Sequence, residues 1–280
     1  MKQIFSSIKG KFVPIAAGGI GLLALLAAGA YASHSWNGYH WARTANPFTL
    51  ELGDNVSSAW YSYLDTASTD WSGGSAVLDT AIVAGGTNNT RGKYTPKNCV
   101  PTSGRVEVCN AKYGFNGWLG VASVWVSGTH IVQGTVKVND SYFKLSTYNT
   151  PAWKRMVMCQ EVAHTFGLDH QDEDFDNPNL GSCMDYTSDP DGPPSNEHPN
   201  PHDLEQIETM YAHLDSTTTI GQAASGPGNR AGNEADGQEV AEWGKAIRTS
   251  SDGKPSLYER DLGNGQKVFT FVFWADRGAK

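Results

Sequence analysis

The sequence predicts a mixed α+β fold in which one large domain is followed by a small β-rich segment. The chain has 280 residues, of which 39% are apolar and 11% aromatic, so it is long and apolar enough to form a real core. Helix-like patterns are interspersed with strand-like patterns, the helices at residues 55–72, 152–166 and 201–211 and the strands at residues 77–84, 105–108 and 119–143. Neither class of element dominates, which favours a mixed fold.

A change in composition divides the chain. Residues 216–237 are mainly Ser, Thr, Gly, Ala and Asn, which is typical of a flexible linker. We therefore expect the main domain at residues 33–215 and a second segment at residues 238–280. This second segment has strand patterns separated by glycine turns, at residues 239–247, 257–261 and 268–274. At roughly 40 residues it is too small to fold without support from the main domain.

The first 32 residues have the pattern of a targeting segment. Lys2, Lys9 and Lys11 precede an uncharged apolar run at residues 12–32, which ends in Ala-Tyr-Ala. This pattern predicts a signal peptide that is cleaved before Ser33. The run is long for a signal peptide, so a membrane anchor formed by residues 12–32 stays as the alternative. Both interpretations place the domain outside the cytoplasm, either secreted or anchored to a membrane.

Charge and cysteine content narrow the class further. Without residues 1–32 the chain keeps 18 basic and 29 acidic residues, a net charge of −11. Such a surface argues against nucleic acid as a partner. The chain has four cysteines, an even number, which in an exported protein indicates two disulfides.

The elements before residue 150 follow from local patterns. Residues 55–72 form an amphipathic pattern around Trp60, Tyr61 and Leu64, which indicates a helix. Strands at residues 77–84 and 105–108 are separated by glycine-rich turns, and residues 119–143 have the composition of further strands.

The helix at residues 152–166 has a start signal and a stop signal. Thr150 is a good N-cap, Pro151 fits the first helical position, and Gly167 is the expected C-terminal stop. Gln160 and His164 are four residues apart and therefore project from one face, with Glu161 one position round. A glycine can take a positive φ, so Gly167 lets the chain turn sharply. The turn brings His170 back toward the position that His164 faces.

This segment resembles the active site of the metzincin metallopeptidases, and most of all their matrixin-like branch. The family motif is H-E-x-x-H-x-x-G-x-x-H, and this chain matches it except at the first position, with the residues Gln160-Glu161-Val162-Ala163-His164-Thr165-Phe166-Gly167-Leu168-Asp169-His170. Residues 181–186, Gly-Ser-Cys-Met-Asp-Tyr, are similar to the Met-turn of that clan. The resemblance covers roughly residues 36–215. It implies a zincin fold with a twisted mixed sheet, an active-site helix beneath it and a Met-turn.

The resemblance also implies roles for individual residues. His164, His170 and Gln160 would bind Zn²⁺, and Glu161 would be the general base toward a metal-activated water. Met184 would lie beneath the metal. Tyr186 would donate a hydrogen bond to the developing oxyanion, or else pack under the site. The substrate would be a peptide or protein.

Two disulfide pairs are expected on the same basis. Cys159 would pair with Cys183 and tie the active-site helix to the Met-turn, and Cys99 would pair with Cys109 as a local crosslink. Another pairing, or free buried thiols if the chain is not exported, stays open.

Gln160 decides whether the predicted chemistry survives, because an amide oxygen is a weaker zinc ligand than imidazole. Three outcomes are open: Gln160 is a weak ligand, another residue replaces it, or the site has lost its metal. His198 and His202 are the nearest other histidines in sequence. The remaining histidines have no ligand-like spacing and are expected to be structural, namely His34, His40, His130 and His213.

An acidic loop after the helix has alternating carboxylates at Asp172, Asp174 and Asp176. Asn177 at the sixth position and Cys183 at the twelfth exclude an EF-hand. Calcium binding in another arrangement and a solvated charged loop stay as the two interpretations.

The predicted function is therefore that of an exported zinc-dependent endopeptidase. The first alternative is a non-catalytic binding protein that keeps the scaffold and has lost zinc through Gln160. The second is an adhesion or structural module held at the cell envelope.

Overall fold

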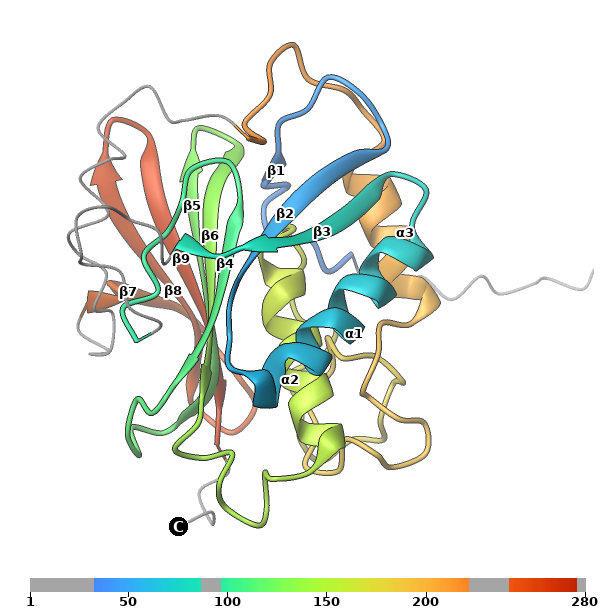
Figure 1. Cartoon of the computed structure of the whole chain (residues 1–280), viewed down its shortest axis with the longest axis vertical. Helices are drawn as coiled ribbons and strands as arrows, with labels where there is room; N and C mark the ends of the chain where they lie inside the picture. The colour runs from blue at the N-terminus through green and yellow to red at the C-terminus, as the bar shows by residue number, and fades with distance from the viewer. Residues whose placement is uncertain (1–32, 87–96, 222–241, 276–280) are drawn as a thin grey trace, which may run out of the picture. The chain divides into compact units, whose positions relative to one another are not determined.

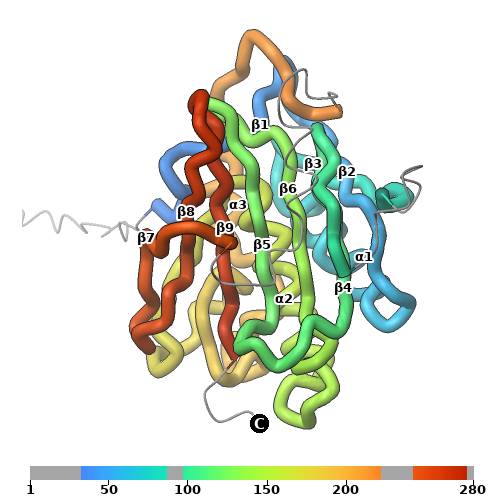
Figure 2. Tube along the Cα trace, turned by 90° about the vertical axis from the view of Figure 1, so that its left-hand side faces the viewer, coloured from blue at the N-terminus to red at the C-terminus, as the bar shows by residue number. Residues whose placement is uncertain are grey.

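A single mixed sheet runs through the structure, which is a computed structural model that describes residues 33–86, 97–221 and 242–275. The strand order is β3-β2-β4-β6-β5-β9-β8-β7, and β1 pairs with β6 beside this path (Figures 1 and 2). The strands are β1 (His40–Trp41), β2 (Phe48–Asn55), β3 (Leu78–Ala84), β4 (Val106–Ala111), β5 (Trp118–Ser127), β6 (His130–Asn139), β7 (Lys245–Thr249), β8 (Pro255–Gly263) and β9 (Gln266–Trp274). The predicted signal peptide or anchor and residues 222–237 of the predicted linker lie outside the described residues.

The sheet has a parallel half and an antiparallel half. Strands β3, β2, β4 and β6 are paired in parallel, whereas β5 is antiparallel to β6. Helices lie on one side of the sheet in Figure 1: α1 (Ser58–Gly74), α2 (Pro151–His164) and α3 (Pro201–Met210). Helix α2 contacts both α1 and strands β5 and β6. The observed architecture is the mixed α+β fold that the sequence predicts.

Strand β2 was not predicted, although its sequence alternates as a half-buried strand does. Phe48, Leu50 and Leu52 are buried, while Thr49 and Glu51 between them are exposed. The strand ends at Asn55, so α1 begins at Ser58 rather than at the predicted residue 55. The other main elements agree with the predicted ones to within a few residues at each boundary.

The C-terminal strands continue the main sheet. Strand β9 pairs antiparallel with β5 from Trp118 opposite Trp274 to Ser127 opposite Gln266, and β8 and β7 follow outward (Figure 2). Residues 32–280 accordingly form one compact unit, so the expected appendage is built into the sheet of the main domain. The reason is physical: a three-stranded meander this small gains most from burying one edge and one face against an existing core.

Strand β9 has a strict alternation that decides which side chains face the helices. Phe269, Phe271 and Phe273 belong to the large core between sheet and helices. Val272 points to the opposite face, where it joins a smaller cluster with Trp118 and Trp243.

Two findings bear on the compartment of the chain. Among the described residues, no helix is long and apolar enough to cross a membrane. Both expected cysteine pairs are bonded, Cys99 to Cys109 and Cys159 to Cys183. Disulfides of this kind indicate an oxidising compartment.

Candidate functional site

Helix α2 carries the first part of the candidate site. The Thr150 side chain accepts a hydrogen bond from the Trp153 backbone N–H at 3.3 Å, and proline follows at the first helical position, as predicted. Gln160, Glu161 and His164 lie in the last turns of this helix and have no exposed surface. Such complete burial of three polar side chains requires polar partners inside the protein.

Gly167 turns the chain after α2. Its φ is +102°, and a Cβ atom there would lie 2.2 Å from the Tyr39 carbonyl oxygen. Both the conformation and the close contact require glycine. The turn brings the ring of His170 edge-on to that of His164, and their Nε2 atoms are 3.0 Å apart. The predicted convergence of these two histidines is therefore present.

Hydrogen bonds at the far side of each ring define the tautomers. His164 Nδ1 lies 2.9 Å from the Leu168 carbonyl oxygen, which can only accept, so Nδ1 carries the proton. His170 Nδ1 donates in the same way to the Glu173 carboxylate at 2.5 Å. In the neutral rings both Nε2 atoms therefore carry lone pairs, and these face each other. A cation between them would remove this repulsion.

The charges around the two rings favour this neutral form. Burial, followed by the neighbouring His170, lowers the pKa of His164 well below its ordinary value. Burial alone would raise the pKa of Glu173, but the hydrogen bond from His170 and the charges of His170 and Arg248 hold it at about 2. Glu173 is thus an ionised acceptor that orients His170, in the manner of a carboxylate behind a metal-binding histidine.

Gln160 and Glu161 add unpartnered oxygens to the same helix end. The Gln160 amide nitrogen donates to the Cys183 carbonyl oxygen at 2.8 Å, while its Oε1 is buried without a hydrogen-bond partner among the described residues. Both Glu161 carboxyl oxygens are in the same condition. Burial raises the pKa of Glu161 well above its usual range. Gly120 of β5 leaves the space for this side chain, since a Cβ there would lie 2.5 Å from Glu161 Oε1.

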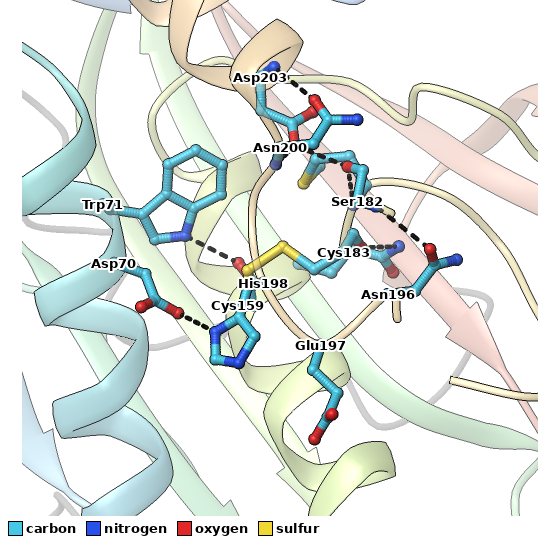
Figure 3. The surroundings of a disulfide bond; sticks show 12 residues. Asp70, Trp71, Cys159, Ser182, Cys183, Asn196, Glu197, His198, Asn200 and Asp203 are labelled. Carbon is cyan, nitrogen blue, oxygen red and sulfur yellow. Dashed lines mark hydrogen bonds and ion pairs between the residues drawn. A yellow bond between two sulfur atoms is a disulfide. The ribbon is translucent and has the colours of Figure 1, made fainter. Parts of the chain in front are cut away.

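The segment around Met184 is tied to both α2 and the loop that follows it. The Cys159–Cys183 disulfide joins it to the helix, as Figure 3 shows. The Gln171 N–H donates to the Met184 carbonyl oxygen at 2.6 Å, and the Tyr186 N–H donates to that of Asp172 at 3.1 Å. Met184 is fully buried in the core. These contacts hold Gln160 and His170 against one rigid turn.

Tyr186 packs beside the histidines rather than pointing its hydroxyl at them. Its ring centroid is 4.5 Å from that of His170, and its hydroxyl donates to the Val272 carbonyl oxygen of β9 at 3.3 Å. Of the two roles expected for Tyr186, this conformation corresponds to packing.

Strand β9 covers the site. Phe271 stacks on His164 with ring centroids 4.1 Å apart, and Phe273 lies 4.8 Å from Tyr186. Strand β7 adds Arg248, whose guanidinium forms a two-pronged ion pair with Asp169 and lies 3.4 Å from Glu173. The sequence analysis did not identify Phe271, Arg248 or Glu173. Only the spacing of Glu173, three residues after His170, offered a local signal.

The other residues considered as ligands lie elsewhere. His198 is half exposed and its Nδ1 is 2.6 Å from an Asp70 carboxylate oxygen on α1 (Figure 3). His202 has its ring 4.8 Å from that of His34. Neither histidine has a printed contact with His164 or His170, so neither replaces Gln160 in this conformation.

The acidic loop gives no support to a calcium site. Asp172 accepts a hydrogen bond from the Asp174 N–H at 2.6 Å, and Asp174 accepts one from the Asp176 N–H at 3.0 Å. These three carboxylates do not belong to any group of converging metal-ligand atoms within the described ranges. The loop uses its carboxylates to satisfy its own backbone.

A cavity of about 420 Å³ opens near Tyr186. Phe175, Thr187 and Trp274 are among its lining residues, and Phe175 in turn packs on Tyr186 at 4.8 Å. None of Glu161, His164 and His170 lines it. The cavity is thus next to the site but closed off from it by aromatic side chains.

The donor set fits a zinc ion. His164 and His170 offer imidazole nitrogens already in the metal-binding tautomer, and Gln160 offers a buried oxygen without a partner. Two nitrogen ligands with one oxygen ligand and an open fourth position is a known arrangement for zinc.

Comparison with known proteins adds little to this description. No protein-family model matches the chain, and no curated protein matches it in sequence. A solved structure that aligns with it is high choriolytic enzyme 1, a hatching enzyme zinc-protease from the medaka fish Oryzias latipes. The sequence identity is 10%, the TM-score is 0.34, and the alignment covers 62% of this chain and 94% of that chain. A TM-score of this size does not establish a shared fold.

Proposed function

We propose that the chain is a zinc-dependent endopeptidase whose C-terminal strands close the active site. The observation that carries this proposal is the pair of His164 and His170 Nε2 atoms, 3.0 Å apart, with both Nδ1 atoms engaged as donors. Two imidazole lone pairs held face to face inside a protein are stable only with a cation between them. The matching of this chain to the metzincin motif is consistent with zinc.

Each polar group of the site then has a role. His164, His170 and the Gln160 amide oxygen hold the ion, and Glu173 orients His170. Zinc, when bound, polarises the scissile carbonyl and lowers the pKa of water. Glu161 takes a proton from the attacking water and passes it to the leaving amine. A positive charge beside Glu161 counteracts the effect of burial and favours the carboxylate that a base requires.

Substrate access requires the C-terminal strands to leave the site. His164, Glu161 and Gln160 are fully buried, and Phe271 lies on the His164 ring. A peptide must reach the reacting atoms, so β9 has to separate from β5 or be displaced by the substrate. Its departure also frees the Tyr186 hydroxyl, which is otherwise bonded to Val272 and which becomes available to stabilise an oxyanion.

A second function is favoured by one specific observation. Gln160 stands where a stronger ligand is expected, and Phe271 seals the site. A protein that binds peptides through its sheet edge without cleaving them is therefore the alternative. Zinc content separates the two, because only the peptidase needs the ion.

The test compares Glu161→Gln with Glu205→Gln, an exposed control on α3. Zinc content and hydrolysis of a broad peptide library are measured in both, in the parent background and in a Phe271→Leu background that opens the site. We expect Glu161→Gln to keep zinc and to lose about two to four orders of magnitude in hydrolysis, with no change for Glu205→Gln. Equal hydrolysis by both variants would remove Glu161 from the mechanism, and absence of zinc would favour the binding protein.

A further inference from the structure

A second group of histidines gathers where β1, the start of β6 and the segment after α3 meet. We propose that His40, His130, His213 and Asp215 form a structural site for a divalent transition metal of the zinc class. This site uses none of the residues of the proposed active site. His40 and His130 are direct partners in the parallel pairing of β1 with β6, and His213 and Asp215 follow α3 closely.

The ligand atoms of this group are spaced as the corners of a small tetrahedron. Asp215 Oδ1 lies 3.2 Å from His130 Nε2, 3.5 Å from His40 Nε2 and 3.7 Å from His213 Nε2. His213 Nε2 lies 3.1 Å from His40 Nε2. Ligands that bind zinc tetrahedrally at about 2.0–2.1 Å are roughly 3.3 Å from one another, which these distances approach on every edge.

Contacts behind the ligands orient them toward a common point. His40 Nδ1 is 2.7 Å from the Gly38 carbonyl oxygen, so it carries the proton and leaves Nε2 as a lone pair. Asp215 Oδ2 accepts from the Arg43 backbone and guanidinium at 3.2 Å and 2.9 Å, which directs Oδ1 to the histidines. Hydrogen bonds of this type behind a metal site determine the tautomer and the rotamer of its ligands.

An ordinary hydrogen-bonded network accounts less well for the same geometry. Because His40 Nδ1 is the donor, His40 Nε2 carries no proton in the neutral ring and cannot donate to Asp215. It would then face the Asp215 oxygen at 3.5 Å with a lone pair against a negative charge. Protonating the ring instead would add a positive charge in a cluster that already contains Arg43. A metal ion satisfies all four ligand atoms at once.

Three imidazoles and one carboxylate suit zinc, and four protein ligands leave no position for a substrate. The role is therefore structural. The site would clip together three segments that are distant in sequence, one of which is the N-terminal segment that supports the proposed active site. Within that segment the Trp36 N–H donates to the Gly167 carbonyl oxygen at 3.3 Å, and the Asp169 N–H donates to that of His34 at 2.5 Å.

The test uses the full chain and measures zinc stoichiometry and affinity in His213→Ala. His213 has a side chain that is 52% exposed, so this substitution leaves the core intact. The matched control is His198→Ala, which removes a side chain that is 50% exposed and pairs with Asp70. We expect His213→Ala to bind one zinc fewer than the parent, or to bind it at least tenfold more weakly, and His198→Ala to match the parent.

A His164→Ala/His170→Ala variant separates this site from the proposed active site. We expect it to keep one zinc ion, and X-ray absorption on that ion to show nitrogen and oxygen neighbours only, with imidazole scattering. Zinc should also raise the thermal midpoint of the parent and of His198→Ala more than that of His213→Ala. If the parent and His213→Ala bind zinc with the same stoichiometry and affinity, the inference is wrong, whatever the double variant does.

Discussion

The imidazole ring of His164 lies parallel to the phenyl ring of Phe271, with centroids 4.1 Å apart and planes inclined by 8°. The two residues belong to α2 and to β9, which are more than 100 positions apart in sequence. This stack means that the last strand of the chain covers a histidine that we propose as a metal ligand. Loosening β9 should therefore open the site.

Replacing Phe271 tests this directly. We expect Phe271→Leu to expose His164 and to speed its modification by diethylpyrocarbonate, followed by peptide mapping. Phe269→Leu is the matched control, because Phe269 is equally buried on the same strand but packs on Trp36 at 4.6 Å. Both variants should lose stability, by less than the roughly 3–5 kcal/mol of a Phe→Ala change. Equal modification of His164 in the two variants would contradict the proposed cover.

The ion pairs of Arg248 provide a second way to loosen the C-terminal strands. Arg248 contacts Asp169 and Glu173 on either side of His170. We expect Arg248→Gln to raise amide hydrogen exchange in β9 and to increase any peptide hydrolysis. Lys267→Gln is the control, since Lys267 pairs with Glu259 within the C-terminal strands at 2.9 Å. Unchanged exchange in β9 for Arg248→Gln would show that the ion pairs do not hold the strands.

Much of the site could be predicted because its signals are local. The cap at Thr150, the proline after it, the helical spacing of Gln160 and His164, and the glycine turn at Gly167 are all read from neighbouring residues. Their geometry is set by backbone sterics and helix periodicity, so the sequence determines it nearly alone.

The missed features depend on contacts between distant segments. Phe271 reaches His164 only because β9 pairs with β5, and strand pairing is not encoded in either strand by itself. The same is true of His40, His130 and His213, which were expected to be structural because their spacing in sequence resembles no metal motif. The pairing of β1 with β6 brings the first two together, and the chain after α3 brings the third.

The pH dependence of stability offers a test near the Met184 turn. Burial raises the pKa of Asp185 to about 6, above the ordinary value of 3.8. A carboxyl whose pKa is raised by folding favours the folded state at low pH, and this contribution is lost as the pH rises through about 6. We expect Asp185→Asn to be as stable as the parent below about pH 4 and more stable above pH 6, in urea unfolding. The exposed control Asp191→Asn should follow the parent curve, and a parallel curve for Asp185→Asn would refute the assignment.

The Cys159–Cys183 disulfide should matter more for the site than for the rest of the fold. It closes a loop of 24 residues, which on the chain-entropy model stabilises by about 3 kcal/mol. We expect Cys159→Ala/Cys183→Ala to raise hydrogen exchange mainly at residues 159–170 and 181–186, because Gln160 is also bonded to Cys183. The control is Cys99→Ala/Cys109→Ala, which removes a crosslink over 10 residues away from the site. Similar exchange patterns in both would leave the first disulfide without a special role.

Gln160 offers the sharpest test of the metal itself. Its amide nitrogen is bonded to Cys183, which leaves its oxygen as the candidate ligand. Imidazole is a stronger zinc ligand than an amide oxygen, so we expect Gln160→His to raise zinc affinity at least about tenfold, a difference of roughly 1.4 kcal/mol. The titration is best done in a His213→Ala background, so that the second proposed site does not obscure the first.

Three results of that titration have different meanings. Weak zinc binding that becomes tight in Gln160→His supports Gln160 as a ligand. Zinc binding only after the substitution means that the natural chain is the non-catalytic binding protein. Equal affinity in both proteins removes Gln160 from the coordination sphere and leaves His164 and His170 to share the ion with water or substrate. The facing Nε2 atoms of these two histidines favour the first result, because they already need a cation between them.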